Sequence, residues 1–416
     1  MDSKKRLIEN FLSLSSVQFA GYIFPLLTVP YLLRVLGPEK FGLLIFAQAI
    51  IQYFVTFSNY GFNLTAVREI SVNRDDRVKV SEIFCAVMVI KFIFLLMSFL
   101  ILFLLCNSVA KFKNDYVIYY LTFGIAIGGA MFPIWLFQGL EKMKLMAILS
   151  FFPKVFFTLM VFIFIKTEND YLFYPVILSL GFFFTGLISI WIIVKELKIK
   201  ILTPSIKLIK YHLKEGWFVF ISLLGNSLYS TSNVFILGML TNNVMVGYFS
   251  AAEKIVRAIS SLMMVSSQTI YPHIGKLASE SKEVALKFAR KIFLLVGIPN
   301  LLISCSLFLF ARQIGDIFFG KNYEDTIIII RILSFMPIIA WVGNFCSVQI
   351  MLNFNFKKQF SKIIISAGIF NLIFLFPLIH YYQHFGTAWS LLITEFYITI
   401  ISFTYVQTHN LKIIGS

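Results

Sequence analysis

Three charged side chains lie close together in a stretch that otherwise has the composition of a membrane span. They are Glu253, Lys254 and Arg257 in YFSAAEKIVRAI, residues 248–259. On a helix, Glu253 and Arg257 stand four residues apart and can pair, whereas Lys254 still needs an acceptor. Basic groups in a water-filled cavity bind anions such as phosphates. The pattern favours an anion-binding site, and a purely structural Glu253–Arg257 pair is the alternative.

The expected depth of these charges in the membrane helps to decide between the anion-binding site and the structural ion pair. If the span runs from 246 to 269, Arg257 lies at its midpoint, from which a long side chain does not easily reach the lipid headgroups. A lone charge at that depth costs at least about 2.5–3.5 kcal/mol on insertion scales. A hydrated cavity that holds an anion accommodates all three groups better than an ion pair alone does.

The composition is that of a membrane protein. Hydrophobic residues make up 59% of the 416 residues, charged residues make up 13%, and 48 residues are Phe. The apolar residues occur in runs of about 20, the helix length that crosses about 30 Å of hydrocarbon. We therefore expect an all-α polytopic membrane protein, embedded in the lipid bilayer through about twelve spans. These are 11–33, 41–63, 83–106, 116–138, 146–165, 172–194, 216–239, 246–269, 292–311, 327–351, 363–382 and 386–407.

The basic residues predict topology and not nucleic-acid binding. The net charge is +16, and Lys and Arg are concentrated in alternate connections between the expected spans. By the positive-inside rule, this asymmetry places both termini in the cytoplasm. The four cysteines lack the spacing of metal ligands or of a redox pair. The sequence also contains no nucleotide-binding or metalloprotease motif, so we expect no metal and no cofactor.

A weak internal repeat divides the expected spans into two sets of six. The segment LGPEKFGLLIFAQAI, 36–50, is similar to LGMLTNNVMVGYFSAAEKI, 237–255. Gly42 and Gly247 occupy matching positions, each six residues before a polar side chain. Because six is even, both halves have the same orientation and form a parallel repeat with a pseudo-two-fold axis along the membrane normal, as in two-lobed transporters. The expected lobes are 1–200 and 201–416.

Polar side chains repeat at helical spacing in several expected spans. Successive positions are three or four residues apart, so they share one face of a helix. Lipid cannot satisfy such groups, and these faces therefore meet either protein or water. Interhelical hydrogen bonding is one explanation, and a polar cavity shared by the two lobes is the other. The candidate lining residues are Gln48, Gln52, Thr56 and Asn59 in the second span, Asn226, Ser230 and Asn233 in the seventh, and Glu253 in the eighth.

The first span contains two prolines and ends in a basic residue. Pro25 and Pro30 each remove a backbone donor and crowd the preceding turn, so the helix should bend or break. The bend is either a fixed kink or a moving element in gating. Arg34, near the outer end of the same span, either reaches the headgroups or faces the cavity.

Three other ionisable residues carry weaker signals. Glu395, in the last span, either pairs inside the bundle or takes part in proton coupling, a role that Glu253 could also fill. His380 and His384 have the i,i+4 spacing of two metal ligands, but no carboxylate or third ligand is near them in the sequence. We therefore interpret the two histidines as interfacial or packing residues.

Four motifs resemble those of one transporter family. They are PLLTVPYLLRVLGPEKFGLLIFAQAI, SNYGFNLTAVREIS, VGYFSAAEKI and TIYPHIGKLAS. The chain is similar to the polysaccharide (O-antigen, Wzx-type) flippases of the multidrug/oligosaccharidyl-lipid/polysaccharide exporter superfamily. The similarity covers both halves, with matching span count and topology.

This resemblance implies a V-shaped bundle of two lobes, alternating access and a cationic central cavity. It implies transport of undecaprenyl-diphosphate-linked oligosaccharide units from the cytoplasmic to the periplasmic leaflet of the bacterial inner membrane, for O-antigen or other surface polysaccharide. The matching basic residues are Arg34, Lys254 and Arg257. Relatives often carry an acidic residue where this chain has Asn233, so a coupling role at that position is in doubt.

Other functions remain as alternatives. A drug exporter of the same superfamily should have an acidic cavity, and lipid II exporters usually have more spans than are expected here. An integral-membrane glycosyltransferase or O-antigen polymerase tends to carry a large outer loop, whereas every outer loop expected here is short. We therefore expect a transporter and not an enzyme, with a polysaccharide polymerase and a chain-length regulator as candidate protein partners.

Overall fold

The computed structural model describes residues 3–320, 323–409 and 411, and within these ranges it contains helices and no β-strand. Side chains are described there except at 3–20, 22, 226, 228–229, 262–269 and 272. Helices satisfy their own backbone hydrogen bonds, which hydrocarbon cannot do for them. The all-α fold expected from the apolar runs is confirmed.

Two compact units share the chain, and α1 (Ser3–Asn59) contributes to both. The first unit contains Met1–Phe24 and Leu44–Leu224, and the second contains Pro25–Leu43 and Gly225–Ser416. The middle part of α1 therefore packs with the C-terminal unit, although its two ends pack with the N-terminal one. The expected lobe boundary between residues 200 and 201 stays a prediction.

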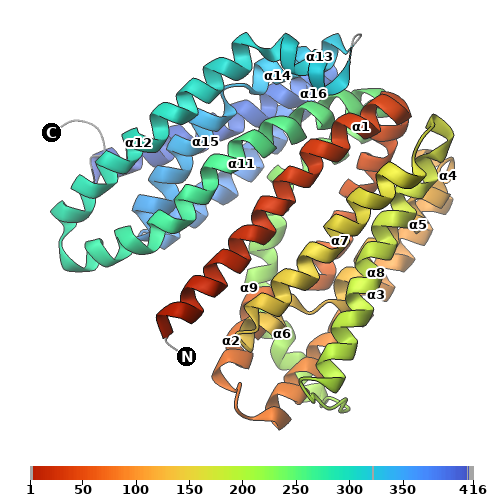
Figure 1. The fold of residues 1–416 in the computed structure, drawn as a ribbon, viewed down its shortest axis with the longest axis vertical. Helices are drawn as coiled ribbons and strands as arrows, with labels where there is room; N and C mark the ends of the chain where they lie inside the picture. Colours follow the sequence, from red (N-terminus) through yellow and green to blue (C-terminus); the bar gives the residue numbers. More distant parts are fainter. Residues whose placement is uncertain (1–2, 321–322, 410, 412–416) are drawn as a thin grey trace. The chain divides into compact units, whose positions relative to one another are not determined.

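The first unit is a bundle of helices in which α5 packs against α8 and α3, and α8 packs against α7 (Figure 1). Its core includes Phe62, Phe84, Trp135 and Phe137, which are all buried. These side chains come from α2, α3 and α6, so the short α6 lies inside the unit. Besides its parts of α1, the unit contains α2 (Phe62–Val72), α3 (Arg77–Ser108), α4 (Ala110–Lys113), α5 (Tyr116–Met131), α6 (Ile134–Gly139), α7 (Met143–Phe164), the 3₁₀ helix η1 (Glu168–Leu172), α8 (Phe173–Lys195) and most of α9 (Ile206–Ser230).

The second unit packs α11 against α12, α14 and α16, and packs α15 against α16 and α12 (Figure 1). Its core includes the buried Phe345, Cys346 and Ile350, which lie on a π-helical segment. Besides its part of α1 and the end of α9, the unit contains α10 (Ser232–Leu240), α11 (Asn243–Glu280), α12 (Lys282–Leu309), α13 (Ala311–Phe319), α14 (Glu324–Leu333), α15 (Met336–Asn344), the π helix η2 (Phe345–Leu352) and α16 (Lys357–Thr408).

The outer faces of the long helices are apolar. On α3, Phe92, Leu96, Leu100 and Phe103 are exposed at the spacing of one helix face. A large apolar face of this kind is stable in contact with lipid and not in contact with water. Among the described residues, eight helical segments are long and apolar enough to cross a membrane. The chain is a multi-pass membrane protein, and the expected number of about twelve spans stays a prediction.

The turn expected between the first two spans lies at Gly37 inside α1. This residue has φ 71° and ψ 168°, a conformation that glycine adopts at little cost. Pro25 and Pro30 lie within α1, where Gly37 is the residue that departs from helical dihedral angles. A break at the two prolines is therefore not observed, and their role in gating stays a prediction.

The two glycines matched by the internal repeat lie in one close contact within the second unit. Each glycine faces backbone atoms of the helix segment that carries the other. A Cβ atom on Gly42 would lie 1.8 Å from the Asn243 carbonyl oxygen. A Cβ atom on Gly247 would lie 2.1 Å from the Pro38 carbonyl oxygen. Only a residue without a side chain fits at either position, because the obstructing atoms belong to the backbone. The repeat therefore marks a close contact between α1 and α11.

Substituting Gly247→Ala should destabilise the protein. The added methyl group forces α1 and α11 apart, and overpacking of this kind costs about 1–3 kcal/mol. We expect a melting temperature roughly 4–10 °C below that of wild type in a thermal unfolding scan of the detergent-purified protein. Gly129→Ala is the matched control, because a Cβ atom there would meet nothing within 4 Å. Equal melting temperatures for the two variants would contradict the close contact.

Candidate functional site

The charged group on α11 contains a short ion pair. Arg257 Nε donates a hydrogen bond to Glu253 Oε1 at 2.7 Å, and the Glu253 side chain is 11% exposed against 38% for Arg257. The carboxylate therefore lies mostly inside the unit and holds a guanidinium group that remains accessible. A charge-assisted bond of this length fixes the direction in which the guanidinium points.

Lys254 is half-buried beside this pair. Its ammonium has no hydrogen-bond partner within the described residues. Ser250, one turn earlier on the same helix, is fully buried, and its hydroxyl has no hydrogen-bond partner in that part of the structure. This part of α11 thus carries an ion pair, a second cation and a hydroxyl without a hydrogen-bond partner in the described residues. Groups of these types can bind an anion.

Arg34 is held at a different place in the second unit. Its Nη2 atom donates a hydrogen bond to the carbonyl oxygen of Ile317, near the C-terminal end of α13. A cation at this end of a helix also interacts favourably with the helix dipole. Arg34 therefore contacts α13, and its guanidinium group is exposed.

A histidine–carboxylate pair that sequence reasoning missed lies close to the start of α11. His384 Nε2 is 3.2 Å from Asp325 Oδ2, and the His384 side chain is only 5% exposed. The His384 ring stands 6.1 Å from the Tyr248 ring, which stands 6.2 Å from the Tyr323 ring. Tyr323 in turn donates a hydrogen bond to the Leu33 carbonyl oxygen at 3.2 Å. This chain of contacts joins α16, α14, α11 and α1.

Sequence spacing could not reveal that pair. Asp325 lies in the first turn of α14, far from His384 in the sequence, and the two meet only through the fold of the second unit. His380 is exposed on the same helix as His384. Within the described residues, no group of three or more His, Cys, Asp or Glu side chains could hold a metal ion.

The polar residues expected in the second span form a stripe along α1 that consists of Gln48, Gln52, Thr56 and Asn59. Its members lie in different environments. Gln48 forms a side-chain hydrogen bond with Tyr174 of α8, so it contributes to packing inside the first unit. Gln52 is exposed, whereas Thr56 and Asn59 are half-buried. The Thr56 hydroxyl donates to the carbonyl oxygen of Gln52 in its own helix, at 2.9 Å. Gln52 is thus the member of the stripe most available to a ligand.

The polar residues expected in the seventh span fall on both sides of a break in the helix. Ser230 ends α9 and is exposed, and Asn233 near the start of α10 is fully buried. The side chain of Asn226 lies outside the described residues. An exposed and a buried member of one stripe indicate that these residues do not all line one surface.

Glu395 is buried in α16, close to an internal polar network. Asn371 Nδ2 donates to the hydroxyl oxygens of Ser390 and Thr394 at 3.2 and 3.0 Å. Both ends of these bonds belong to α16, which departs from helical dihedral angles at Gln383 and so packs against itself. Interhelical hydrogen bonds of this kind hold membrane helices together. A coupling role for Glu395 stays a prediction.

Lys91 of α3 is an internal cation in the first unit. It is only 1% exposed, and its Nζ atom approaches the Gly129 carbonyl oxygen at 3.5 Å. Within the described residues it has no carboxylate partner. Burial of an ammonium group without a counter-ion is costly, and such residues in membrane spans are candidates for a functional role.

Comparison with known proteins identifies the family. Residues 7–278 match the sequence profile of the family described as "Polysaccharide biosynthesis protein". The chain belongs to this family. A curated relative from Escherichia coli (strain K12), named "Putative O-antigen transporter", is 34% identical over 411 residues, which are 99% of each chain. A relative with the same name from Shigella dysenteriae is 29% identical over 94% of this chain and 98% of its own length.

Solved structures of transporters share the fold of this family member. The lipid II flippase MurJ in an inward closed conformation has a TM-score of 0.77 at 13% identity, covering 96% of this chain and 87% of its own. An inward-facing multidrug resistance MATE family transporter of the MOP superfamily has a TM-score of 0.70 at 15% identity, covering 94% and 96%. At such identities the likeness shows the fold alone. The family resemblance inferred from the four motifs is confirmed.

Substituting Lys91→Met replaces the buried ammonium with an apolar side chain of similar length. Because this removes a desolvation cost that no carboxylate in the described part of the chain offsets, the variant should be at least as stable as wild type. We expect its melting temperature in detergent to equal that of wild type or to exceed it by up to about 5 °C. Lys113→Met, at an exposed lysine of α4, should leave the melting temperature unchanged. A clear decrease confined to Lys91→Met would show that the ammonium is stabilising and would contradict this account.

Proposed function

We propose that the protein flips oligosaccharide units linked to undecaprenyl diphosphate from the cytoplasmic to the periplasmic leaflet of the bacterial inner membrane. The observation that carries the proposal is 34% identity, over 99% of both chains, to the O-antigen transporter relative of Escherichia coli. On this basis the chain is a transporter and not an enzyme. It supplies repeat units for O-antigen or another surface polysaccharide.

The chemistry of such a substrate fits the charged face of α11. A diphosphate headgroup is anionic and would pay a large desolvation penalty in hydrocarbon. Lys254 and Arg257 provide two cations, of which Lys254 has no hydrogen-bond partner in the described part of the chain. In a hydrated cavity these groups replace part of the water around the diphosphate while the polyprenyl tail remains in lipid.

The ion pair gives Glu253 a positioning role in this proposal. The 2.7 Å bond from Arg257 Nε to Glu253 Oε1 orients a guanidinium group that is 38% exposed, so that it can face the anion. Without the carboxylate, the arginine side chain samples several rotamers, and binding then costs conformational entropy. Glu253 thus acts through Arg257 and does not itself touch the diphosphate.

Other residues take secondary roles in the proposed mechanism. Arg34 adds positive charge near the outer end of the first expected span, and Gln52, Ser230 and other polar side chains meet sugar hydroxyls. Pro25 and Pro30 contribute to bending of α1 during alternating access between two lobes around a central cavity. Glu395, buried in α16, is a candidate for coupling to an ion gradient.

Topology and protein partners follow from the same proposal. The concentration of Lys and Arg in alternate connections favours cytoplasmic N- and C-termini. A flippase that delivers repeat units to the periplasmic leaflet needs an enzyme that consumes them there. We propose a polysaccharide polymerase and a chain-length regulator as its protein partners.

Neutralising both cations should abolish transport. Lys254→Ala with Arg257→Ala removes two charge-assisted contacts to the diphosphate, each of which contributes about 1.5–3 kcal/mol. We expect surface polysaccharide in a strain that depends on this protein to fall at least about ten-fold. Immunoblots of the membrane fraction, made alongside, check that the variant is inserted at normal abundance.

The matched control removes two lysines from exposed positions on the same or the adjacent helix. Lys276 lies near the end of α11, and Lys282 is the first residue of α12. Lys276→Ala with Lys282→Ala should retain wild-type polysaccharide levels. Normal polysaccharide from the Lys254/Arg257 variant, at normal abundance, would overturn the proposed site.

Substituting Glu253→Gln distinguishes a role of Glu253 in positioning Arg257 from a role as a titrating group. We expect transport of a lipid-linked oligosaccharide in proteoliposomes to decrease about ten-fold at every pH, because the arginine loses its anchor. The shape of the pH profile should match that of wild type. An unchanged maximal rate together with a flattened pH profile would instead identify Glu253 as the titrating group and contradict the positioning role.

A further inference from the structure

The first unit contains a pocket that the proposed transport does not use. Its volume is about 470 Å³, within the usual range for small-ligand sites. It lies where the α2–α3, α6–α7 and α8–α9 connections meet. The pocket has an apolar part, formed by Val80, Leu140, Leu197 and Ile199, and a charged part, formed by Arg74, Asp75, Arg77, Lys142 and Glu196.

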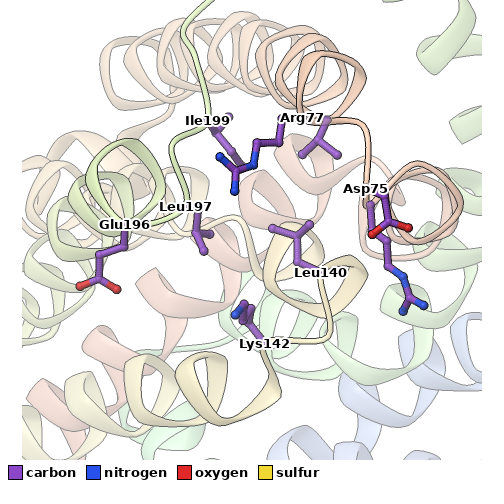
Figure 2. Close-up of a pocket in the computed structure, with 9 residues that line it drawn as sticks. Asp75, Arg77, Leu140, Lys142, Glu196, Leu197 and Ile199 are labelled. Atoms are coloured by element: carbon purple, nitrogen blue, oxygen red, sulfur yellow. The ribbon is translucent and has the colours of Figure 1, made fainter.

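Two cations approach the pocket from opposite sides. Figure 2 shows Arg77 and Lys142 on either side of Leu140 and Leu197, with Asp75 and Glu196 farther out. Neither Arg77 nor Lys142 has an ion-pair or hydrogen-bond partner for its side-chain nitrogens within the described residues. Of the three basic residues in the lining, Arg74 forms an ion pair with Glu141, so Arg77 and Lys142 are the two cations left to contact an anion. The pocket therefore matches an anionic ligand that both side chains can reach.

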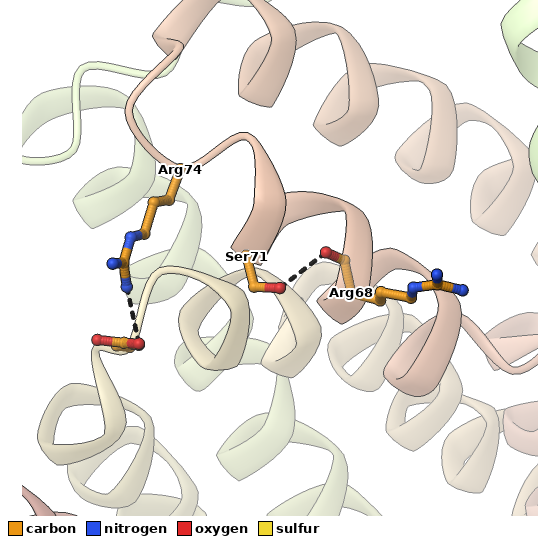
Figure 3. Close-up of polar contacts among 4 residues, drawn as sticks. Arg68, Ser71 and Arg74 are labelled. Atoms are coloured by element: carbon orange, nitrogen blue, oxygen red, sulfur yellow. Dashed lines mark hydrogen bonds and ion pairs between the residues drawn. The ribbon is translucent and has the colours of Figure 1, made fainter.

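The walls of the pocket are held in place by the protein itself. Arg74 Nη1 forms a 2.8 Å ion pair with Glu141 Oε1, which ties the α2–α3 connection to the α6–α7 turn (Figure 3). On another side, the Lys200 amide donates to Ser81 Oγ at 3.1 Å, and the Leu202 amide donates to Cys85 Sγ at 3.1 Å. A pocket arranged before binding loses little conformational entropy when a ligand enters.

The surroundings of the pocket place it at a membrane–water boundary. Arg77 is the first residue of α3, whose outer face becomes apolar toward the exposed Phe92. Lys195 is the last residue of α8, and Trp191, one turn earlier, is exposed. Exposed Trp and basic residues at helix ends are typical of the level of lipid headgroups. A ligand in the pocket would therefore have hydrocarbon chains beside it.

We propose that this pocket binds the phosphate headgroup of an anionic phospholipid. The two unpaired cations meet the phosphodiester, the apolar part contacts the glycerol, and the acyl chains lie along the exposed faces of α3 and α8. The site belongs entirely to the first unit, whereas Lys254 and Arg257 belong to the second. It is thus a lipid site separate from the proposed substrate site.

The test compares how lipids stabilise the purified protein. Wild type, Arg77→Gln/Lys142→Gln and Lys79→Gln/Lys144→Gln are each melted in neutral phosphatidylcholine micelles with and without added phosphatidylglycerol. The control lysines are exposed, lie two residues farther along the same chain segments, and do not line the pocket. We expect phosphatidylglycerol to raise the melting temperature of wild type and of the control by about 4 °C, and to leave the Arg77/Lys142 variant unchanged.

Two further measurements decide the source of the phosphate and the basis of binding. Inorganic phosphate, added without phosphatidylglycerol, should leave wild type unchanged; an equal stabilisation by phosphate alone would overturn the assignment to a lipid. Native mass spectrometry should show about ten-fold less phosphatidylglycerol retained by the Arg77/Lys142 variant than by the control. Equal retention by both variants would mean that the general surface charge attracts the lipid, and would overturn the site.

Discussion

Hydrocarbon offers no hydrogen-bond partner to a peptide group, and the structure of this protein follows from that constraint. Each long helix satisfies its own backbone, and its outer face is built from Phe, Leu and Ile, which lipid accepts. Polar side chains must then find partners inside the units. Gln48 does so with Tyr174, and Asn371 does so with Ser390 and Thr394. A polar group that lacks such a partner is for this reason informative about function.

The close contact between α1 and α11 connects the internal repeat to the candidate site. Gly42 and Gly247 let two backbones approach more closely than any side chain would permit. The contact brings the middle of α1 into the second unit, beside the helix that carries Glu253 and Arg257. Tyr248 lies between the glycine contact and the ion pair in the sequence, and its ring meets Tyr323 and His384. A shift of α1 would therefore displace the start of α11, and this is how the proposed gating by α1 would reach the charged face.

Local patterns predicted the features that depend on helical spacing and on partition into lipid. The apolar runs predicted the all-α membrane fold, and the i,i+4 spacing of Glu253 and Arg257 predicted a pair that the structure contains at 2.7 Å. Contacts between distant segments could not be predicted in this way. The carboxylate beside His384 comes from α14, and the acceptor of Arg34 is a main-chain carbonyl group, which leaves no sign in a sequence. The stripe on α1 was visible, but its division between packing and exposure depends on which helices surround it.

Four basic residues, Lys91, Arg257, Arg77 and Lys142, illustrate three physical situations, and each implies a different use. Lys91 is buried without a carboxylate in the described part of its unit, so its charge is costly and contributes no ion pair. Arg257 is partly exposed and oriented by Glu253, so much of the cost of ordering it has been met before a ligand arrives. Arg77 and Lys142 lie at helix ends beside an apolar surface, where a single phosphodiester finds both a cation and hydrocarbon. Under the proposed function, the second arrangement would bind the anionic substrate, and the third would hold a lipid of the surrounding bilayer.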